Sequence, residues 1–278
     1  MSTTDPAVDD CPSSNDIPML GLGTWENDDP EACAASVETA LEMGYRHIDT
    51  AQAYGNEAAV GEGIAAADVD REEVFLATKV WIDNLAHDDV IATTEASLDR
   101  LGVDSVDLMY VHWPSRTYDA EETLAAFNEL HADGKIDRIG VSNFEPDQLR
   151  EAIELSDAPI VANQVECHPL LQQAELREVT AEEGVELVAY SPLARGDVFD
   201  VQELQEIADD HDASPAQVSL AWLRQQGITA IPKATSEAHI RDNWQSLSLT
   251  LSDEEIERIE NIEQNGRRVD PGFGPWKQ

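Results

Sequence analysis

Four polar residues stand at nearly even intervals in the chain. Asp49, Lys79, His112 and Ser142 are separated by 30, 33 and 30 residues, and each stands at the end of a predicted strand. Lys79 is the most unusual of them, because it follows the apolar run 74–78 in a chain that has only four lysines. An ammonium there would be partly desolvated, and a nearby carboxylate such as Asp49 could keep it charged. The lysine is therefore either half of a buried ion pair or, as in a Schiff-base aldolase, a nucleophile toward a carbonyl.

The elements that would position these residues alternate along the chain from about residue 20. Short apolar runs of strand length are separated by longer amphipathic runs of helical period. The predicted strands are Leu20–Thr24, Arg46–Asp49, Val74–Lys79, Val106–His112, Arg138–Ser142, Ile160–Gln164, Glu186–Tyr190 and Ile228–Lys233. The predicted helices include Glu31–Glu42, Asp88–Leu101, Glu121–Ala132 and Ala174–Glu183. Capping signals at Ser214 and Ser252 predict two more helices, the last of which ends near Ile262.

Eight strands, each followed by a helix, predict a (β/α)8 TIM barrel, an α/β fold of about 250 residues. In such a barrel the C-terminal ends of the strands meet at one face, which carries the catalytic groups. A doubly wound open sheet is the alternative, but it normally opens an early helix with Gly-x-Gly-x-x-Gly. The pair Gly61 and Gly63 lacks the third glycine and falls within a helical stretch. We therefore expect one domain, with an acidic disordered tail at residues 1–16, the barrel at 17–262 and a C-terminal tail at 263–278.

The charge of the chain excludes two classes of partner. Lys and Arg number 17 against 57 Asp and Glu, which gives a formal net charge of −40. Nucleic acids and anionic membrane surfaces both require clusters of basic residues, so neither is an expected partner. Repulsion among so many carboxylates is screened in molar salt, where the Debye length falls to about 3 Å. We interpret the chain as an acidic, halophilic protein that works in concentrated KCl; an acidic protein of an ordinary cell is the alternative.

Cysteine usage and hydropathy point to a reducing, cytoplasmic location. Cys11, Cys33 and Cys167 are odd in number and share no close spacing, so they predict neither a disulfide framework nor a metal site. The remaining histidines share no metal-ligand spacing either, and we expect no metal. There is no apolar run of about 20 residues, and residues 1–16 do not read as a signal peptide.

Nine motifs, in order along the chain, resemble those of the aldo-keto reductases. They are Gly23-Thr24-Trp25, Tyr45-Arg46-His47-Ile48-Asp49-Thr50-Ala51, Tyr54-Gly55-Asn56-Glu57, Thr78-Lys79-Val80-Trp81, Leu108-Met109-Tyr110-Val111-His112-Trp113-Pro114, Ile139-Gly140-Val141-Ser142-Asn143-Phe144, Asn163-Gln164-Val165-Glu166, Ala189-Tyr190-Ser191-Pro192-Leu193 and Ile231-Pro232-Lys233-Ala234-Thr235. The resemblance covers roughly residues 17–262. The short stretch after Leu193 is similar to the small bacterial and archaeal members of the 2,5-diketogluconate reductase type.

The resemblance implies that a nicotinamide cofactor reduces an aldehyde or ketone, reversibly, without a Rossmann domain. The family's catalytic tetrad falls on Asp49, Tyr54, Lys79 and His112. Hydride attack places negative charge on the carbonyl oxygen, and Tyr54 would quench it as general acid. We expect Lys79 to lower the Tyr54 pKa, Asp49 to hold Lys79 in place, and a neutral His112 to orient the carbonyl.

The family pattern also assigns the cofactor contacts. Ser142, Asn143 and Gln164 would hold the nicotinamide carboxamide, and Tyr190 would stack on the ring. Thr24, Trp25, Asp49, Ser191 and Leu193 complete the expected set near the nicotinamide and the pyrophosphate. Arg195 is our own addition at the pyrophosphate; it either contacts the cofactor or plays no part.

The adenosine end departs from the family's NADP pattern. Lys233 is retained for the 2′-phosphate, with Thr235 beside it and Asn243 for the adenine. Ala234 stands where a hydroxyl residue is common, and His239 where NADPH-dependent relatives usually have an arginine. We therefore expect weakened preference for NADPH/NADP+, with NADH/NAD+ also accepted; the alternative is that these changes have no consequence in molar salt.

The expected substrate is a small aldehyde or ketone, and the expected state of the protein is a monomer. The predicted substrate pocket consists of Trp25, Tyr54, Trp81, His112 and Trp113. The tail segment Phe273-Gly274-Pro275-Trp276 either folds over this pocket or stays away from it. Besides the reductase, a non-catalytic nicotinamide-binding regulator and the Schiff-base aldolase remain as alternative functions.

Overall fold

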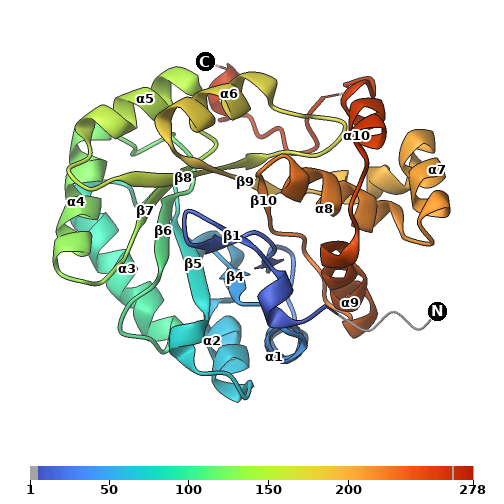
Figure 1. Ribbon diagram of the computed structural model, residues 1–278. Coiled ribbons are helices and arrows are strands. Elements are labelled where there is room, and N and C mark those ends of the chain that lie inside the picture. The colour runs from blue at the N-terminus through green and yellow to red at the C-terminus, as the bar shows by residue number, and fades with distance from the viewer. Residues whose placement is uncertain (1–5, 265, 278) are drawn as a thin grey trace.

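Parallel strands form a closed barrel at the centre of the molecule, and helices surround it (Figure 1). The computed structural model describes residues 6–264 and 266–277. The strands of the barrel follow one another in chain order around the sheet. They are β3 (Leu22–Gly23), β4 (His47–Asp49), β5 (Phe75–Val80), β6 (Leu108–Val111), β7 (Ile139–Ser142), β8 (Ile160–Glu166), β9 (Glu186–Tyr190) and β10 (Thr229–Ala230). Parallel bridges from Leu20 to Ala230 and from Gly23 to Lys233 close the sheet, which confirms the (β/α)8 barrel.

The helices follow the strands and carry the capping signals that the sequence contains. They are α1 (Pro30–Met43), α2 (Glu57–Ala66), α3 (His87–Leu101), α4 (Ala120–Ala132), α5 (Pro146–Leu155), α6 (Ala174–Glu183), α7 (Gln202–Asp210), α8 (Pro215–Gln225), α9 (Glu237–Gln245) and α10 (Asp253–Glu260). Ser214 caps α8 and Ser252 forms a capping box with Glu255 at the start of α10. The last helix ends at Glu260, slightly before the predicted end. Among the described residues, no helix combines the length and the apolar character needed to span a membrane.

Two apolar clusters make the core. The inner cluster fills the barrel with Ile17, Phe75, Ala77, Leu108, Tyr110, Ala162, Val188 and Ile231. The larger outer cluster lies between the strands and the helices. Because side chains alternate along each strand, one set points into the barrel and the next packs under the helices.

The N-terminal segment differs from the expected disordered tail over residues 6–16. A short 3-10 helix, Val8–Asp10, leads into a hairpin in which β1 (Ser13–Ser14) pairs with β2 (Ile17–Pro18). The hydroxyl of Ser14 donates to the buried carboxylate of Glu186 at 2.5 Å, and the fully buried Ile17 joins the inner core. Tertiary contacts of this kind order a polar segment that its own composition would leave unfolded. The first five residues of the predicted tail lie outside the described residues.

The last barrel strand is shorter than the predicted Ile228–Lys233. Pro232 has no N–H with which to continue the ladder, so regular pairing stops after Ala230. The backbone nevertheless stays beside the first strand, because the carbonyl of Pro232 accepts a hydrogen bond from Gly23 N at 3.1 Å.

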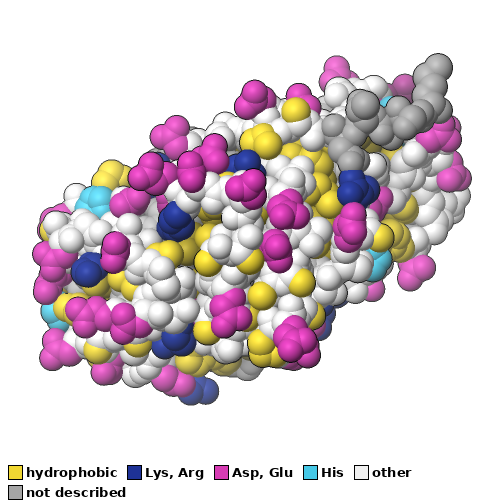
Figure 2. All heavy atoms as spheres, turned by 90° about the horizontal axis from the view of Figure 1, so that it is seen from below, with side chains coloured by type: hydrophobic (Ala, Val, Ile, Leu, Met, Phe, Trp, Pro, Cys, Tyr) yellow, Lys and Arg dark blue, Asp and Glu magenta, His cyan; other side chains and the backbone are white. Residues whose placement is uncertain are grey.

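Acidic side chains outnumber basic ones on the face of the molecule shown in Figure 2, where they are scattered among uncharged side chains and backbone. This agrees with the 57 acidic and 17 basic residues of the sequence.

Candidate active site

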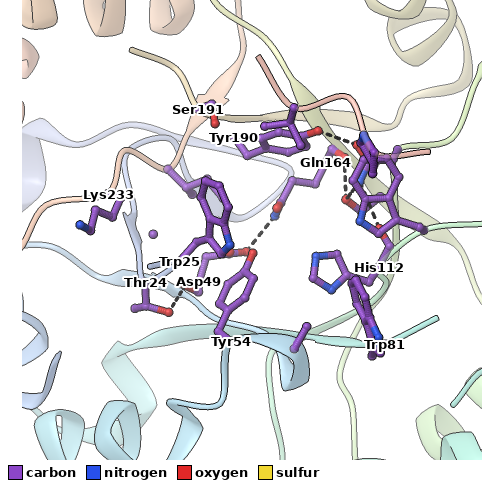
Figure 3. A pocket seen from close by; sticks show the side chains of 18 of the residues that line it. Thr24, Trp25, Asp49, Tyr54, Trp81, His112, Gln164, Tyr190, Ser191 and Lys233 are labelled. Carbon is purple, nitrogen blue, oxygen red and sulfur yellow. Dashed lines mark hydrogen bonds between the residues drawn. The ribbon is translucent and has the colours of Figure 1, made fainter. Parts of the chain in front are cut away.

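The C-terminal ends of neighbouring strands bring the evenly spaced residues together. Asp49 is the last residue of β4, Lys79 the penultimate residue of β5, and His112 the first residue after β6. Parallel pairing places these positions at the same end of the barrel, since Asp49 lies opposite Ala77 and Lys79 lies opposite Tyr110. Asp49 and His112 line a cavity of about 470 Å³ at this end of the barrel. Figure 3 shows the side chains that surround it.

Lys79 and Asp49 form a fully buried ion pair. The ammonium donates to Asp49 Oδ1 and to the carbonyl oxygen of Thr50, the latter at 2.9 Å. The second oxygen of Asp49 accepts from Gln164 Nε2 at 2.8 Å (Figure 3). Burial lowers the pKa of Lys79, and the adjacent carboxylate of Asp49 opposes that shift. Asp49 thereby favours the charged ammonium form of Lys79.

Tyr54 places its hydroxyl beside this ammonium. It ends a 3-10 turn, Gln52–Tyr54, and its Oη lies 3.5 Å from Lys79 Nζ. Burial, then the negative charge of Asp49, raises the pKa of Tyr54 well above 10. Burial sets this direction, because it penalises a phenolate. The expected lowering contribution of the Lys79 ammonium, which also donates to the Tyr54 hydroxyl, stays a prediction.

His112 is held neutral beside Tyr54. Its ring lies edge-to-face with Tyr54, at a centroid distance of 5.7 Å, and with Trp81, at 5.1 Å. Burial and the nearby Lys79 charge hold the pKa of His112 well below 6.5. Its Nδ1 has no hydrogen-bond partner among the described residues. A neutral imidazole with one N–H is what the sequence analysis expected.

A polar wall of the cavity is formed by Ser142, Asn143, Gln164 and Tyr190. The hydroxyl of Ser142 donates to the carbonyl of Gln164 at 2.8 Å, and Asn143 Nδ2 donates to the carbonyl of His112 at 3.1 Å. The hydroxyl of Tyr190 donates to Asn143 Oδ1 at 2.9 Å. Asn143 adopts a left-handed conformation with φ +63°, which asparagine tolerates better than most residues. The wall thus offers fixed amide and hydroxyl groups of the kind that hold a carboxamide, together with an aromatic ring.

Comparison with known proteins identifies the family. The model of the "Aldo/keto reductase family" matches residues 19–264. The chain belongs to this family. It is accordingly an oxidoreductase, as its motifs predicted.

Three relatives of this reductase show how far the similarity extends. A solved structure of a protein provisionally named 2,5-diketo-D-gluconic acid reductase B is 41% identical, covers 94% of both chains and superposes with a TM-score of 0.91. The glyoxal reductase of Bacillus subtilis is 39% identical over 252 residues, 91% of each chain. The aldo-keto reductase of Bombyx mori, solved in complex with NADP, is 33% identical with a TM-score of 0.88 over 97% of this chain and 96% of that one.

The apolar wall of the reductase's cavity includes part of the C-terminal tail, which the sequence analysis expected either to fold over the pocket or to stay away from it. Trp25, Trp81 and Trp113 line the cavity as predicted, and the C-terminal tail adds Val269, Pro271 and Phe273. The Phe273 ring lies 5.4 Å from that of Trp113 and 6.1 Å from that of Trp81. Gly23, Ala53 and Ile231 also line the cavity. The signal for the tail was the presence of apolar residues in a segment that follows the last helix and has no helical period of its own.

Lys233 and Ser191 line the same cavity, and Lys233 lies at the opposite end from Trp81 and His112 (Figure 3). Five other predicted cofactor residues do not line it: Leu193, Ala234, Thr235, His239 and Asn243. Thr235 and His239 are exposed near the start of α9, where Ser236 caps the helix by accepting from His239 N at 3.3 Å.

Arg195 bridges two loops at the edge of the cavity. Its guanidinium carbon lies 4.7 Å from the centroid of the Trp25 ring, and its Nη2 lies 3.1 Å from Glu26 Oε1. The structure therefore places Arg195 against the loop after β3, and its role toward the pyrophosphate stays a prediction.

Proposed function

We propose that this reductase transfers hydride between NADPH and the carbonyl carbon of a small aldehyde or ketone, with Tyr54 as the general acid. The observation that carries the proposal is the position of the Tyr54 hydroxyl, 3.5 Å from the buried Lys79 ammonium and next to a neutral His112. Nicotinamide, when bound, supplies the hydride. The chain must supply the proton, the orientation of the carbonyl and the exclusion of water.

The raised pKa of Tyr54 suits a proton donor. A phenol that stays protonated at neutral pH carries the proton that the carbonyl oxygen needs as it gains negative charge. An alkoxide is far more basic than a phenolate, so transfer from Tyr54 Oη to that oxygen is favourable. The phenolate left behind lies beside the Lys79 ammonium, which stabilises it.

His112 and the polar wall would orient the two reactants. A neutral imidazole can donate one hydrogen bond to the carbonyl oxygen, which fixes it beside Tyr54. The donors and acceptors of Ser142, Asn143 and Gln164 fit a planar carboxamide, and Tyr190 offers a flat face to the nicotinamide ring. Thr24, Trp25, Asp49, Ser191, Leu193, Lys233, Ala234, Thr235, His239 and Asn243 are proposed to complete the cofactor site.

The lining of the cavity favours an uncharged substrate. The end near Tyr54 and His112 is walled by tryptophans and by the apolar tail, and of the described lining residues only Lys233, at the far end, is permanently cationic. A carboxylate or phosphate on the substrate would enter an apolar space without a counter-charge. We therefore propose small neutral carbonyls, such as glyoxal-type dicarbonyls and aromatic aldehydes, in preference to sugar acids.

The buried ion pair argues against the aldolase alternative. Lys79 is fully buried and donates to both Asp49 and Thr50, so it would have to lose these bonds before its nitrogen could attack a carbonyl. The following experiment separates the regulator alternative from the reductase.

Initial rates with a generic aromatic aldehyde and with glyoxal, measured in molar KCl with NADPH, test the proposal. Tyr54→Phe should lower kcat by about 10²-fold or more, in the range of general acid catalysis, while NADPH binding measured by fluorescence stays unchanged. Turnover undiminished by Tyr54→Phe would contradict Tyr54 as the acid. Tight binding with no turnover by the wild type would favour the regulator.

A further inference from the structure

Glu166 connects the barrel to the C-terminal tail. It is the last residue of β8, its side chain is fully buried, and it does not line the cavity. Its Oε1 accepts a hydrogen bond from Arg268 N at 2.6 Å, and its Oε2 accepts one from Val269 N at 3.0 Å. One carboxylate thus binds two consecutive backbone N–H groups of a segment about a hundred residues further along the chain.

His168 fixes the orientation of this carboxylate. His168 Nε2 lies 3.0 Å from Glu166 Oε1, and both side chains are fully buried. A carboxylate accepts only, so Nε2 must carry the hydrogen. Within the described chain Nδ1 has no partner, as expected for the lone-pair nitrogen of that tautomer. The side chain of Gln173 donates to the backbone carbonyl of Glu166 at 2.7 Å and so also fixes the backbone of this residue.

The segment that Glu166 binds continues directly into the wall of the substrate pocket. Val269, Pro271 and Phe273 line the cavity, and Phe273 packs against two tryptophans of the barrel loops. Further on, the Trp276 ring lies 5.6 Å from that of Trp113. The position of this wall therefore depends on where residues 268 and 269 are held.

Two ion pairs of the tail are more exposed than this contact. Arg268 pairs with Asp197, whose side chain is 53% exposed, and Arg267 pairs with Glu145, whose side chain is 37% exposed. Exposed ion pairs contribute little and are screened further by salt, whereas buried hydrogen bonds to a carboxylate are among the stronger ones in proteins. Glu166 is thus the dominant polar attachment among these contacts.

We propose that Glu166 is a positioning residue for substrate specificity. Its buried carboxylate holds the tail as the aromatic wall of the pocket and so sets the affinity for carbonyl compounds with a large apolar group. A two-carbon dialdehyde such as glyoxal reaches only the region of Tyr54 and His112 and does not need the wall. This inference rests on the proposed function for its kinetic consequence, but the attachment of the tail can be tested without turnover.

Glu166→Gln is the test variant, and Glu186→Gln is its matched control. Glu186 is also buried and also accepts from a backbone N–H, that of Thr229, but it lies at the opposite end of the barrel and holds the N-terminal hairpin. A glutamine at 166 can accept with one oxygen only and turns an NH2 group toward the other donor. The KM for 4-nitrobenzaldehyde should rise about tenfold, as for one lost hydrogen bond to a charged group. The KM for glyoxal, both kcat values and the NADPH dissociation constant should stay within about twofold of wild type, the uncertainty of such comparisons.

A double-mutant cycle shows whether Glu166 acts through the tail. Phe273→Ala removes the aromatic wall, so adding Glu166→Gln to that variant should raise the KM for the aromatic aldehyde no further. Full additivity of the two effects would overturn the proposal. So would an equal rise in Glu186→Gln, since that would indicate general loosening of the fold.

Limited trypsin digestion measures the attachment independently of catalysis. Cleavage after Arg267 or Arg268, followed by mass spectrometry, should be faster in Glu166→Gln than in wild type or Glu186→Gln. An unchanged cleavage rate would overturn the proposal even if the kinetics change. If the wild type reduces no carbonyl, the proposed function fails, while the digestion result still decides whether Glu166 holds the tail.

A variant on the tail side keeps the test valid if Glu166→Gln does not fold. Val269→Pro removes one of the two N–H donors and leaves the buried Glu166–His168 pair intact. Trypsin does not cleave between an arginine and a following proline, so the readout in this variant is cleavage after Arg267 alone. It should be faster than in the wild type, and cleavage there at the wild-type rate would count against the proposal.

Discussion

Burial disfavours the charged form of three neighbouring side chains in the site, but a carboxylate opposes this effect at only one of them. It disfavours the charged form of Tyr54, Lys79 and His112 alike, but of these only Lys79 directly contacts a carboxylate. The site therefore combines an ammonium, paired with the Asp49 carboxylate, and two neutral groups that can each donate a hydrogen bond. This is the distribution that carbonyl reduction needs, since negative charge develops on the oxygen only during the reaction.

The low pKa of His112 makes the stability of the protein depend on pH. The folded protein holds this pKa well below 6.5, whereas in the unfolded chain it lies near 6.5, so below pH 6.5 the unfolded state binds more protons. The contribution of the neutral His112 to the unfolding free energy is fully present above pH 6.5 and is lost as the pH falls below 6.5. Between pH 7.5 and 5.5, wild type should lose about 1 kcal/mol more unfolding free energy than His112→Gln.

Urea unfolding at the two pH values measures this difference. Because His239 is exposed, His239→Gln is the control and should follow the wild type. Parallel behaviour of wild type and His112→Gln would show that His112 can be protonated in the folded protein.

A substitution at His239 tests how the protein recognises the 2′-phosphate of NADPH. In the wild type we expect the ratio of kcat/KM with NADPH to that with NADH to be below about a thousand, or roughly 4 kcal/mol. His239→Arg should raise the ratio about tenfold, since arginine adds a charge and a bidentate fork for phosphate. Ala238→Arg adds the same charge at the adjacent exposed position and should change the ratio less. Equal effects of both variants would show that net charge, rather than the position of residue 239, decides the preference.

At the scale of elements, two glycines let α2 lie close to its neighbours. A Cβ at Gly61 would lie 2.3 Å from the carbonyl oxygen of Leu101, at the end of α3, and a Cβ at Gly63 would lie 2.5 Å from that of Ala34 in α1. The glycine pair is thus explained by helix packing, in agreement with the reading of this stretch as helix rather than phosphate loop. Since α2 follows the Tyr54 turn directly, its packing also fixes the base of the site.

Gly61→Ala should destabilise the protein in spite of the better helix propensity of alanine. The propensity gain is about 1 kcal/mol, whereas forcing a methyl group against backbone costs about 1–3 kcal/mol or more. A distance of 2.3 Å to a backbone oxygen places the cost in the upper part of that range, so we expect a net loss of about 1–2 kcal/mol in urea unfolding. Gly272→Ala is the control, because Gly272 is exposed and a Cβ there has no atom within 4 Å. A Gly61→Ala variant as stable as wild type would mean that α2 can move away from α3.

The barrel and the ends of its strands could be predicted because local patterns determine them. These patterns are strand-length apolar runs, glycine and serine caps, and polar residues at strand ends. Each depends only on residues that lie close together in the sequence. The tail wall could not be assigned in full, because backbone N–H groups bound to the distant Glu166 place it, and no periodicity marks Val269 or Pro271. The raised pKa of Tyr54 could not be predicted for a similar reason, since the burial that raises it exists only in the folded protein.

At the scale of the whole molecule, the net charge of −40 opposes folding in dilute buffer. Acidic side chains are scattered over the face seen in Figure 2, so on that face the repulsion is not confined to one patch. Exposed ion pairs such as Arg116 with Asp83 are also screened by salt, but each contributes only about 0–1 kcal/mol. The relief of repulsion should therefore exceed the loss of these pairs.

We propose on this basis that the protein is halophilic and that molar KCl stabilises it. The midpoint of urea unfolding should rise by about 1 M between dilute buffer and 2 M KCl, which corresponds to about 3 kcal/mol at an m-value of about 3 kcal/mol per M. Sucrose of equal osmolality is the control, because it is excluded from protein surfaces without screening charge. A midpoint that is equal in dilute buffer and in KCl, or that rises as much in sucrose, would leave an acidic protein of an ordinary cell. A rise specific to KCl would mean that the catalytic measurements on Tyr54 and Glu166 belong in molar salt, where the fold that positions them is intact.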